Sequence, residues 1–308
     1  MKSMNNCFLF IAAAAVFSFC NEPLKPANAG KDVFADNVDS TANPADDFFQ
    51  FVNGKWFKSN PIPGSETNWG IGKIVREEIY NNLKKINQEA ASANAAEGTD
   101  TKKIGDFWST GMDSVKADKL GTQPLQKQLD MISAVKDVKG IVQTMVALEP
   151  LQVGFFYAGF YVTQDAKNSE VMGVTLWQGG IGLPDRDYYF NDEKEIRENY
   201  VQHLTNMLGL IGETPADAKK KADGIMAFET GLAMNSRKLE DQRDPFANYN
   251  KMSIDDVTRV LTPSISWRDL AAAHSITKID SIVVGQPEFL SGLEKSLKAT
   301  DVEILKAY

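Results

Sequence analysis

Helical periodicity is the feature that most constrains the fold of this 308-residue chain. In the segment from Val75 to Ile86, apolar residues recur at three- and four-residue spacing, with charged residues between them. This spacing places the apolar side chains on one face of a helix. Similar stripes occur in five further segments, which are 125–135, 196–211, 216–234, 253–261 and 290–297. The sequence therefore predicts a mainly helical protein.

Residues that favour helix ends stand beside these segments. Pro124 precedes one of them, and proline suits the first turn of a helix. Ser253 and Asp256 have the spacing of a capping box, and Gly212 directly follows another segment. These residues set the expected boundaries of the helices.

One region has a different composition. Residues 153–163 and 171–177 are rich in aromatic and β-branched residues, and the polar stretch 164–170 separates them. Such runs are typical of β-strands. We therefore expect a small β-hairpin with a longer loop, set into an otherwise helical protein.

The N-terminus has the pattern of an export signal. Lys2 is followed by an uncharged apolar run over 8–19, which is shorter than the about 20 residues that a membrane-spanning helix needs. Such a run is typical of a secretory signal peptide. Cys20 closes the run, as in bacterial lipoprotein signals, in which this cysteine is lipidated and becomes the new N-terminus. We expect a signal peptide over 1–20 and lipidation at Cys20; the alternative is an ordinary signal peptide with an incidental cysteine.

Residues 21–45 are rich in Pro, Asn, Ala and Asp, a composition that favours a flexible tether. The folded body is expected to begin at residue 46. Together with the signal, this organisation predicts an exported protein of the cell envelope. We expect it either at a membrane surface, which it contacts through the lipid anchor, or in the periplasm. No other uncharged run approaches the length of a membrane span.

Charge and histidine content exclude several function classes. The chain has 33 basic and 41 acidic residues, so its net charge is −8. Nucleic-acid binding, which relies on the neutralisation of phosphates, is therefore not expected. The two histidines, His203 and His274, do not form the His-Glu-x-x-His motif of zinc hydrolases, and no Gly-x-Ser-x-Gly nucleophile motif is present. We expect neither catalytic nor metal-ligating residues in this chain.

The run LPDRDYY is the most distinctive motif. Arg186 stands between Asp185 and Asp187, a pattern that favours a bidentate ion pair that fixes a loop. Paired carboxylates also serve in acid–base catalysis, but no nucleophile or metal ligand accompanies them here. A structural network is therefore the preferred interpretation. Residues 243–245 (RDP) are interpreted similarly, as a helix stop with charge pairing.

Several short motifs follow one another in an order that is characteristic of one family. They are Asp47–Trp56, Asn60–Pro63, Trp69-Gly70, Ile104–Trp108, Gly180–Tyr189, Phe228–Ala233 and Arg243–Pro245. The series covers residues 45–308 and resembles the N-terminal lobe of the neprilysin and endothelin-converting-enzyme family of zinc metallopeptidases. The resemblance implies that residues 46–308 form the N-terminal lobe of a two-lobe enzyme.

The resemblance also implies which lobe carries the chemistry. Family members cleave peptides outside the cytoplasm, and their two largely helical lobes enclose a large cavity. Their zinc ligands and catalytic glutamate belong to the C-terminal lobe, which has no counterpart in this sequence. We therefore expect zinc in the complete enzyme, none in this chain, and no peptidase activity of this chain alone. The expected partners are peptide substrates and a C-terminal zinc lobe.

One substrate-binding position of the family has a counterpart here. In neprilysin-like members, an arginine before an aromatic-glycine pair binds the C-terminal carboxylate of the substrate. Asn68 stands at this position, before Trp69-Gly70. Asparagine lacks the positive charge and the forked geometry of arginine. The resemblance therefore implies internal cleavage of peptides, the activity of an endopeptidase.

The sequence is thus interpreted as the N-terminal portion of a bacterial, envelope-anchored metalloendopeptidase, a lobe that roofs the substrate cavity. Two alternatives stay open. One is a non-catalytic module that binds a peptide or a partner, and the other is a lobe that complements a separately encoded zinc lobe. The last residues, 301–308, predict a short helix whose apolar side chains are left uncovered.

Overall fold

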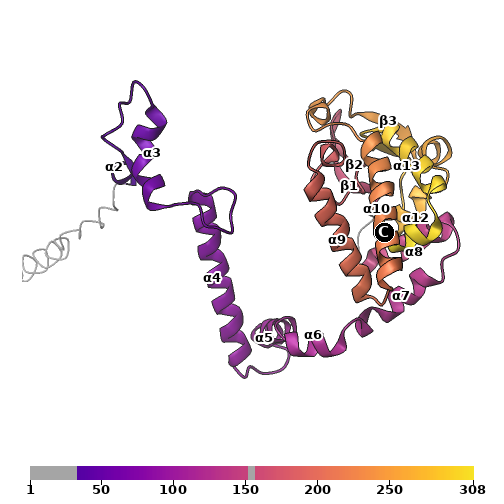
Figure 1. Ribbon diagram of the computed structural model, residues 1–308, viewed down its shortest axis with the longest axis horizontal. Coiled ribbons are helices and arrows are strands. Elements are labelled where there is room, and N and C mark those ends of the chain that lie inside the picture. Colours follow the sequence, from indigo (N-terminus) through magenta and orange to yellow (C-terminus); the bar gives the residue numbers. More distant parts are fainter. Residues whose placement is uncertain (1–32, 152–156) are drawn as a thin grey trace, which may run out of the picture. The chain divides into compact units, whose positions relative to one another are not determined.

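The computed structural model describes residues 33–151 and 157–308 (Figure 1). The chain divides into two compact units, Met1–Ser114 and Val115–Tyr308. Helices dominate both units, and the second also contains a small sheet. The predicted class, mainly helical with a small β element, is confirmed.

The first unit is a series of helices. Asp47 and Thr99 cap two of them, because each side chain accepts a hydrogen bond from the backbone N–H of a first-turn residue, Gln50 at 2.8 Å and Lys102 at 3.3 Å. The α-helices in its described part, residues 33–114, are α2 (Val33–Asn37), α3 (Phe48–Ser59), α4 (Ile71–Ser92) and α5 (Asp100–Gly111). The helix predicted over 75–86 is confirmed as part of α4.

A buried aspartate, Asp39, links residues 38–41 to α3. The Asp39 carboxylate accepts hydrogen bonds from Lys58 Nζ at 2.7 Å and Thr41 Oγ1 at 2.6 Å. The backbone N–H of Asp39 donates to the carbonyl of Phe51 at 2.7 Å. These contacts hold residues 38–41, which belong to the predicted tether, against α3. The rest of that tether before residue 33, like the predicted signal, lies outside the described residues.

The second unit contains the remaining α-helices of the described chain, together with short 3-10 turns. In Figure 1, α9 and α10 run side by side, in agreement with their packing contacts. The helices are α6 (Ser114–Leu120), α7 (Gln126–Ser133), α8 (Val138–Leu148), α9 (Lys194–Leu210), α10 (Pro215–Asn235), α11 (Ile254–Asp256), α12 (Trp267–Ala273), α13 (Pro287–Ala299) and α14 (Val302–Ala307). Most stripes therefore formed helices; the one at 253–261 is α11 followed by a π-helical turn, Val257–Leu261.

The sheet has four strands in the order β1-β2-β4-β3. The strands are β1 (Ala158–Asp165), β2 (Asn168–Gln178), β3 (Asn250–Ser253) and β4 (Ser281–Val284). β1 and β2 form the predicted antiparallel hairpin, although residues 153–156 of the expected first strand lie outside the described chain. The longer loop is wrong, since both strands continue through it to a tight turn at 166–167. β4 pairs parallel with β2 and antiparallel with β3.

The main core of the second unit lies between this sheet and its helices. Leu176 and Val284 of the sheet are fully buried, as are Trp267 of α12 and Leu293 of α13. Two smaller clusters extend it, one between α9 and α10 and one beneath residues 181–200. Burial of this much apolar surface is the dominant stabilising term for the unit.

The C-terminal helix α14 is covered, so the expectation of exposed apolar groups over 301–308 is wrong. Leu305 is buried at 3% exposure. The ring of Tyr308 stacks on Tyr157 with centroids 5.7 Å apart and meets the edge of Phe228 at 5.0 Å. The Tyr308 hydroxyl donates to the carbonyl of Gly180 at 2.9 Å. A helix too short to persist in water is thus held by tertiary packing.

Candidate functional site

The LPDRDYY motif forms the loop between β2 and α9. Asp185 caps a 3-10 turn, Arg186–Tyr189, by accepting a hydrogen bond from the backbone N–H of Asp187 at 2.7 Å. Arg186 Nη1 pairs with Asp187 Oδ1 at 3.0 Å, and Arg186 Nε donates to the carbonyl of Ala233 at 3.2 Å. The predicted structural network is confirmed. Its expected bidentate ion pair is wrong, because Asp185 is used as a cap and the guanidinium reaches across to α10.

Beneath this loop lies a buried glutamate that the sequence did not reveal. Glu229 of α10 is 2% exposed. Its carboxylate accepts hydrogen bonds from the hydroxyls of Tyr189 and Tyr200 at 2.6 and 2.9 Å and from the N–H of Gly182 at 3.2 Å. The available signal was a charged residue beside Phe228 on a helix face, which usually indicates a solvated side chain. Here it joins two of the family motifs, Gly180–Tyr189 and Phe228–Ala233.

Burial controls the proton affinity of this cluster. Removal of water from the carboxyl raises the pKa of Glu229, although its three donors oppose the shift. Burial and the adjacent carboxylate raise the pKa of both Tyr189 and Tyr200 well above the ordinary tyrosine value. The hydroxyls therefore stay protonated as donors at neutral pH. The arrangement is that of a hydrogen-bonded clamp, in which Tyr189, Tyr200 and Gly182 hold the Glu229 carboxylate.

A second polar network orders the chain after α10. Arg237 forms an ion pair with Glu288 and donates to Asn248 Oδ1 at 3.0 Å. The Gln286 side chain joins this network, because its Nε2 donates to Asn248 Oδ1 at 3.1 Å and its Oε1 accepts from the backbone N–H of Gln178 at 2.9 Å. The expected charge pairing within 243–245 is wrong, because the carboxylate of that segment accepts backbone N–H groups and no ion pair within the described chain involves its arginine.

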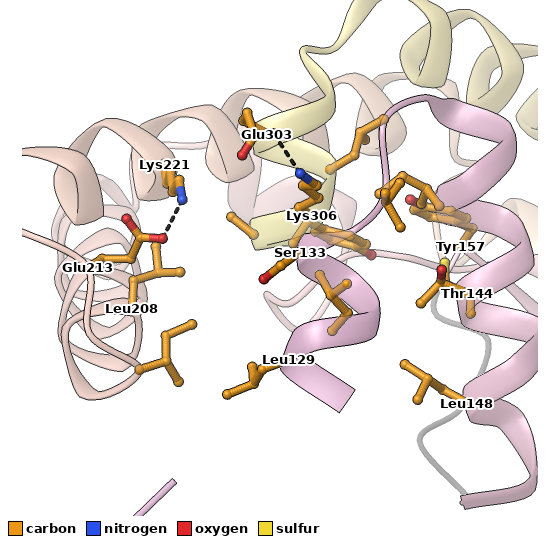
Figure 2. Close-up of a pocket in the computed structure, with 18 residues that line it drawn as sticks. Leu129, Ser133, Thr144, Leu148, Tyr157, Leu208, Glu213, Lys221, Glu303 and Lys306 are labelled. Carbon is orange, nitrogen blue, oxygen red and sulfur yellow. Dashed lines mark hydrogen bonds and ion pairs between the residues drawn. The ribbon is translucent and has the colours of Figure 1, made fainter. Parts of the chain in front are cut away.

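The second unit also contains a cavity of about 550 Å³. Figure 2 shows side chains of α7, α8 and α9 pointing into it, among them Leu129, Leu148 and Leu208. Two ion pairs lie at its edge, Glu213 with Lys221 and Glu303 with Lys306. This volume is typical of small-molecule pockets. Its lining is mainly aliphatic, so the cavity suits an apolar group rather than acid–base chemistry.

The described residues do not fit a zinc ion. No group of three His, Cys, Asp or Glu side chains comes together in residues 33–151 and 157–308. His274 Nε2 lies 3.0 Å from Glu149 Oε1, and its ring stacks on Phe160 with centroids 5.2 Å apart. His203 lies on α9. Neither histidine has the partners of a metal ligand, and no catalytic step follows from these side chains.

The two candidate site residues of the sequence are Asn68 and Cys20. Asn68 is exposed in the connection before α4, in the first unit, whereas the cavity belongs to the second unit. Nearby, Glu66 pairs with Lys73 and Arg76. Cys20 lies outside the described residues. Within the described chain, no helix combines the length and the hydropathy needed to cross a membrane.

Comparison with known proteins decides the family. The sequence model of Peptidase family M13 matches residues 44–308, which is most of the chain. The chain belongs to peptidase family M13. The resemblance to neprilysin and endothelin-converting enzyme is thereby confirmed, and the matched region is the N-terminal part of M13 proteins.

Curated M13 relatives have similar sequences over most of this chain. Endothelin-converting enzyme 1 of Rattus norvegicus is 27% identical over 291 residues, which are 88% of this chain and 37% of that enzyme. Neprilysin-3 of Drosophila melanogaster is 27% identical over 276 residues, which are 83% of this chain and 35% of that protein. The chain thus spans little more than a third of the length of these relatives.

Solved M13 structures share the fold. The zinc metalloprotease Zmp1 of Mycobacterium tuberculosis, in complex with inhibitor, matches with a TM-score of 0.77 and 29% identity, over 88% of this chain and 42% of that chain. PepO from Lactobacillus rhamnosis matches with a TM-score of 0.66 and 18% identity over 86% of this chain, which shows the fold alone. The expected helical N-terminal lobe is therefore confirmed.

Proposed function

We propose that this chain is the N-terminal portion of a bacterial M13 zinc metalloendopeptidase that hydrolyses peptides outside the cytoplasm. The observation that carries the proposal is the family match across residues 44–308. The names of the relatives, which include endothelin-converting enzyme 1 and the zinc metalloprotease Zmp1, support peptide hydrolysis with zinc. Zinc would then belong to the part of the enzyme that has no counterpart here.

The contribution of this chain is shape rather than chemistry. Its described residues lack a metal-binding group, and Glu229, the most buried of its described carboxylates, accepts hydrogen bonds in a structural clamp. We infer that the lobe roofs a substrate cavity and admits small peptides. The zinc lobe that completes the enzyme would lie on the same chain or on a separate one.

Asn68 directs the proposal toward internal cleavage. Its side chain is exposed and therefore available to a ligand. An amide cannot replace the charged fork with which arginine binds a terminal carboxylate. We infer that the complete enzyme does not require a free C-terminus near the cleaved bond, and therefore acts as an endopeptidase.

The proposed location is the cell envelope. The apolar run that ends at Cys20 supports export and lipidation, and the residues up to 45 would connect the anchor to the body. Mass spectrometry of the mature N-terminus tests this. A lipid-modified Cys20 is expected, and an intact Met1 would refute both signal removal and lipidation.

A non-catalytic binding module is the second candidate. The cavity in the second unit favours it, since an aliphatic pocket of about 550 Å³ binds a ligand without any metal. The two candidates predict different neighbours in the genome. A reading frame with His-Glu-x-x-His, continuous after codon 308 or in an adjacent gene, is expected for the peptidase.

Peptide hydrolysis separates the candidates directly. The 308-residue chain alone should release no product from a panel of small peptides. Addition of the polypeptide that carries His-Glu-x-x-His should produce activity that a chelator removes and zinc restores. Hydrolysis by the lone chain with the same chelator and zinc response would overturn the assignment of the chemistry to the other lobe.

A further inference from the structure

The carboxyl group of Glu229 is buried without a cation. Its residue is 2% exposed, and its hydrogen-bond donors are the hydroxyls of Tyr189 and Tyr200 and the N–H of Gly182. Within residues 33–151 and 157–308, no lysine or arginine lies within ion-pair distance of this carboxyl. A carboxylate that is removed from water and faces no positive charge is costly in its ionised form.

The titratable groups that face Glu229 are tyrosines from four different segments. They are Tyr157 before β1, Tyr189 of the 3-10 turn, Tyr200 of α9 and Tyr308 of α14. Burial raises the pKa of each of these hydroxyls well above the ordinary tyrosine value. In this described cluster, Glu229 is therefore the group that changes charge between acid and neutral pH.

The charged side chains of the surrounding elements pair elsewhere. Arg186 of the 3-10 turn pairs with Asp187, Glu294 of α13 with Lys298, and Lys306 of α14 with Glu303. The charge on Glu229 is thus set by its own proton, since none of these pairs includes it.

The clamp holds the turn after β2 from two sides. The N–H of Gly182 donates to Glu229 at 3.2 Å and to the hydroxyl of Tyr189 at 3.1 Å. On the other side of the turn, the carbonyl of Gly180 accepts from the hydroxyl of Tyr308 at 2.9 Å. A change at the carboxyl can therefore reach α14 through this short turn.

The helix α14 depends on such contacts, because six residues are too few for a helix that persists in water. Ile304 packs so closely on α10 that a Cβ added at Gly224 would lie 2.5 Å from its side chain. The ring of Tyr308 meets Phe228, the neighbour of Glu229, at 5.0 Å. Tyr308 also lines the cavity of about 550 Å³, so loss of its contacts would loosen a wall of that cavity.

We propose that the clamp at Glu229 is a pH-operated switch that controls the turn after β2 and α14. With its proton, the carboxyl is neutral, and the clamp stays closed. Release of the proton to solvent leaves a buried charge that faces no cation, which favours a local opening that brings water to the carboxylate. All of these groups belong to the second unit, so the proposal stands whether or not the complete protein is a peptidase.

Acid should keep the clamp closed, and rising pH should open it. Burial raises the pKa of Glu229 in the closed state, whereas contact with water restores the ordinary value of 4.5 in the open state. The stabilisation of the closed state is full below pH 4.5 and is lost as pH rises through the closed-state value. Between these two values opening releases one proton, so the ratio of open to closed clamp rises about tenfold per pH unit and then levels off.

Hydrogen exchange of the 308-residue chain tests the switch. Protection factors, which divide out the intrinsic pH dependence of exchange, are measured for the amides of Gly182 and Leu305 between about pH 4 and pH 8. We expect both to fall by about tenfold per pH unit inside the window and then to level off. In Glu229→Gln, which cannot ionise, they should stay within about twofold. The same slope in this variant, or no slope in the wild type, would overturn the proposal.

The wild type alone provides a second readout. The amide of Leu293, a buried residue of α13, should stay better protected than those of Gly182 and Leu305 at every pH, because the opening is local. Equal protection at the three positions would mean that the whole unit unfolds at once, and would overturn the switch.

Deletion of a hydroxyl should move the pH window. Tyr200→Phe removes a donor from the carboxylate, which disfavours its ionised form in the closed clamp, so the levelling-off should shift to higher pH. Tyr249→Phe is the matched control, because that hydroxyl donates to a different buried carboxylate, Asp165, at 2.9 Å. The control should leave the window in place. A window that stays in place in Tyr200→Phe, or that moves equally in both variants, would contradict the proposal.

Discussion

The two units of this chain bury their amphipathic helices to very different extents. In the second unit, α13 is covered, and Leu290, Leu293 and Leu297 are at most 1% exposed. In the first unit, α4 has an equally regular apolar stripe, but no residue of α4 is buried. Periodicity thus predicts a helix and its apolar face, but it does not predict what covers that face.

Two buried carboxylates, Glu229 in the second unit and Asp39 in the first, are held in different ways. Glu229 of the second unit is surrounded by protein, and burial raises its pKa. Asp39 of the first unit pairs with Lys58, whose side chain is 65% exposed, and the hydrogen bonds from Lys58 and Thr41 lower the Asp39 pKa. Glu229 is thus held by buried tyrosine hydroxyls, and Asp39 is held by an ion pair with an exposed lysine. Asp165 of the second unit is held in the second way, by Lys251 at 2.8 Å.

Truncation of a leucine to alanine should give the largest difference between the units in lost free energy of unfolding. Leu293→Ala deletes a fully buried side chain from the core and should lower the free energy of unfolding by about 2–5 kcal/mol. Leu83→Ala, on the half-exposed stripe of α4, should change it by no more than about 0.5 kcal/mol. Urea unfolding followed by circular dichroism measures both. Equal losses would show that the stripe of α4 is already covered in this chain.

Replacement of glycine by alanine should change the free energy of unfolding in opposite directions in the two units. An added Cβ at Gly182 would lie 2.0 Å from the Tyr200 hydroxyl, so Gly182→Ala should displace the clamp and cost about 1–3 kcal/mol. At Gly72, in the first turn of α4, an added Cβ meets nothing within 4 Å. Gly72→Ala should therefore stabilise the helix by up to about 1 kcal/mol. Thermal unfolding measures whether each variant is more or less stable than the wild type. A less stable Gly72→Ala variant would contradict the open space around residue 72.

The pH dependence of stability should report the clamp. Because the folded state raises the pKa of Glu229, protonation favours folding. The contribution of this carboxyl is full below its ordinary pKa of 4.5 and is lost as pH rises through the folded value. Glu229→Gln removes this titration and keeps an oxygen acceptor for Tyr189, while Tyr200 can accept from the amide. The stability of the wild type relative to this variant should therefore fall from pH 4 toward neutral pH. A constant difference would mean that the carboxyl is hydrated.

Much of the fold was predictable because it depends on local pattern. The apolar residues of α9, α10 and α13 and the caps beside them specify helices without reference to the rest of the chain. β3 and β4 were missed, since each is a four-residue strand that exists only by pairing within the sheet.

The site was less predictable than the fold. The loop at 183–189 was correctly interpreted as structural, because its charges had no chemical partners in sequence. Glu229 was missed, since a glutamate in a helix usually faces water. The covering of α14 was also missed, because it depends on a long-range contact from Tyr308 to Gly180. Asn68 and Cys20 stay predictions.

The smallest change in stability is expected at the Asp39–Lys58 ion pair of the first unit. Asp39→Asn removes the charge that Lys58 pairs with, but the ammonium is largely solvated, so the pair is screened and its loss should stay local. The amide of residue 39, which donates to the Phe51 carbonyl at 2.7 Å, should exchange with deuterium faster in the variant. Since the pKa of Asp39 is lowered in the fold, its contribution is present above the ordinary value of 3.8 and is lost as pH falls through the folded value, the opposite slope to Glu229. Amides of α13 in the second unit should keep their protection. Faster exchange there as well would show that the two units unfold together, and the contrast between them would then describe packing but not stability.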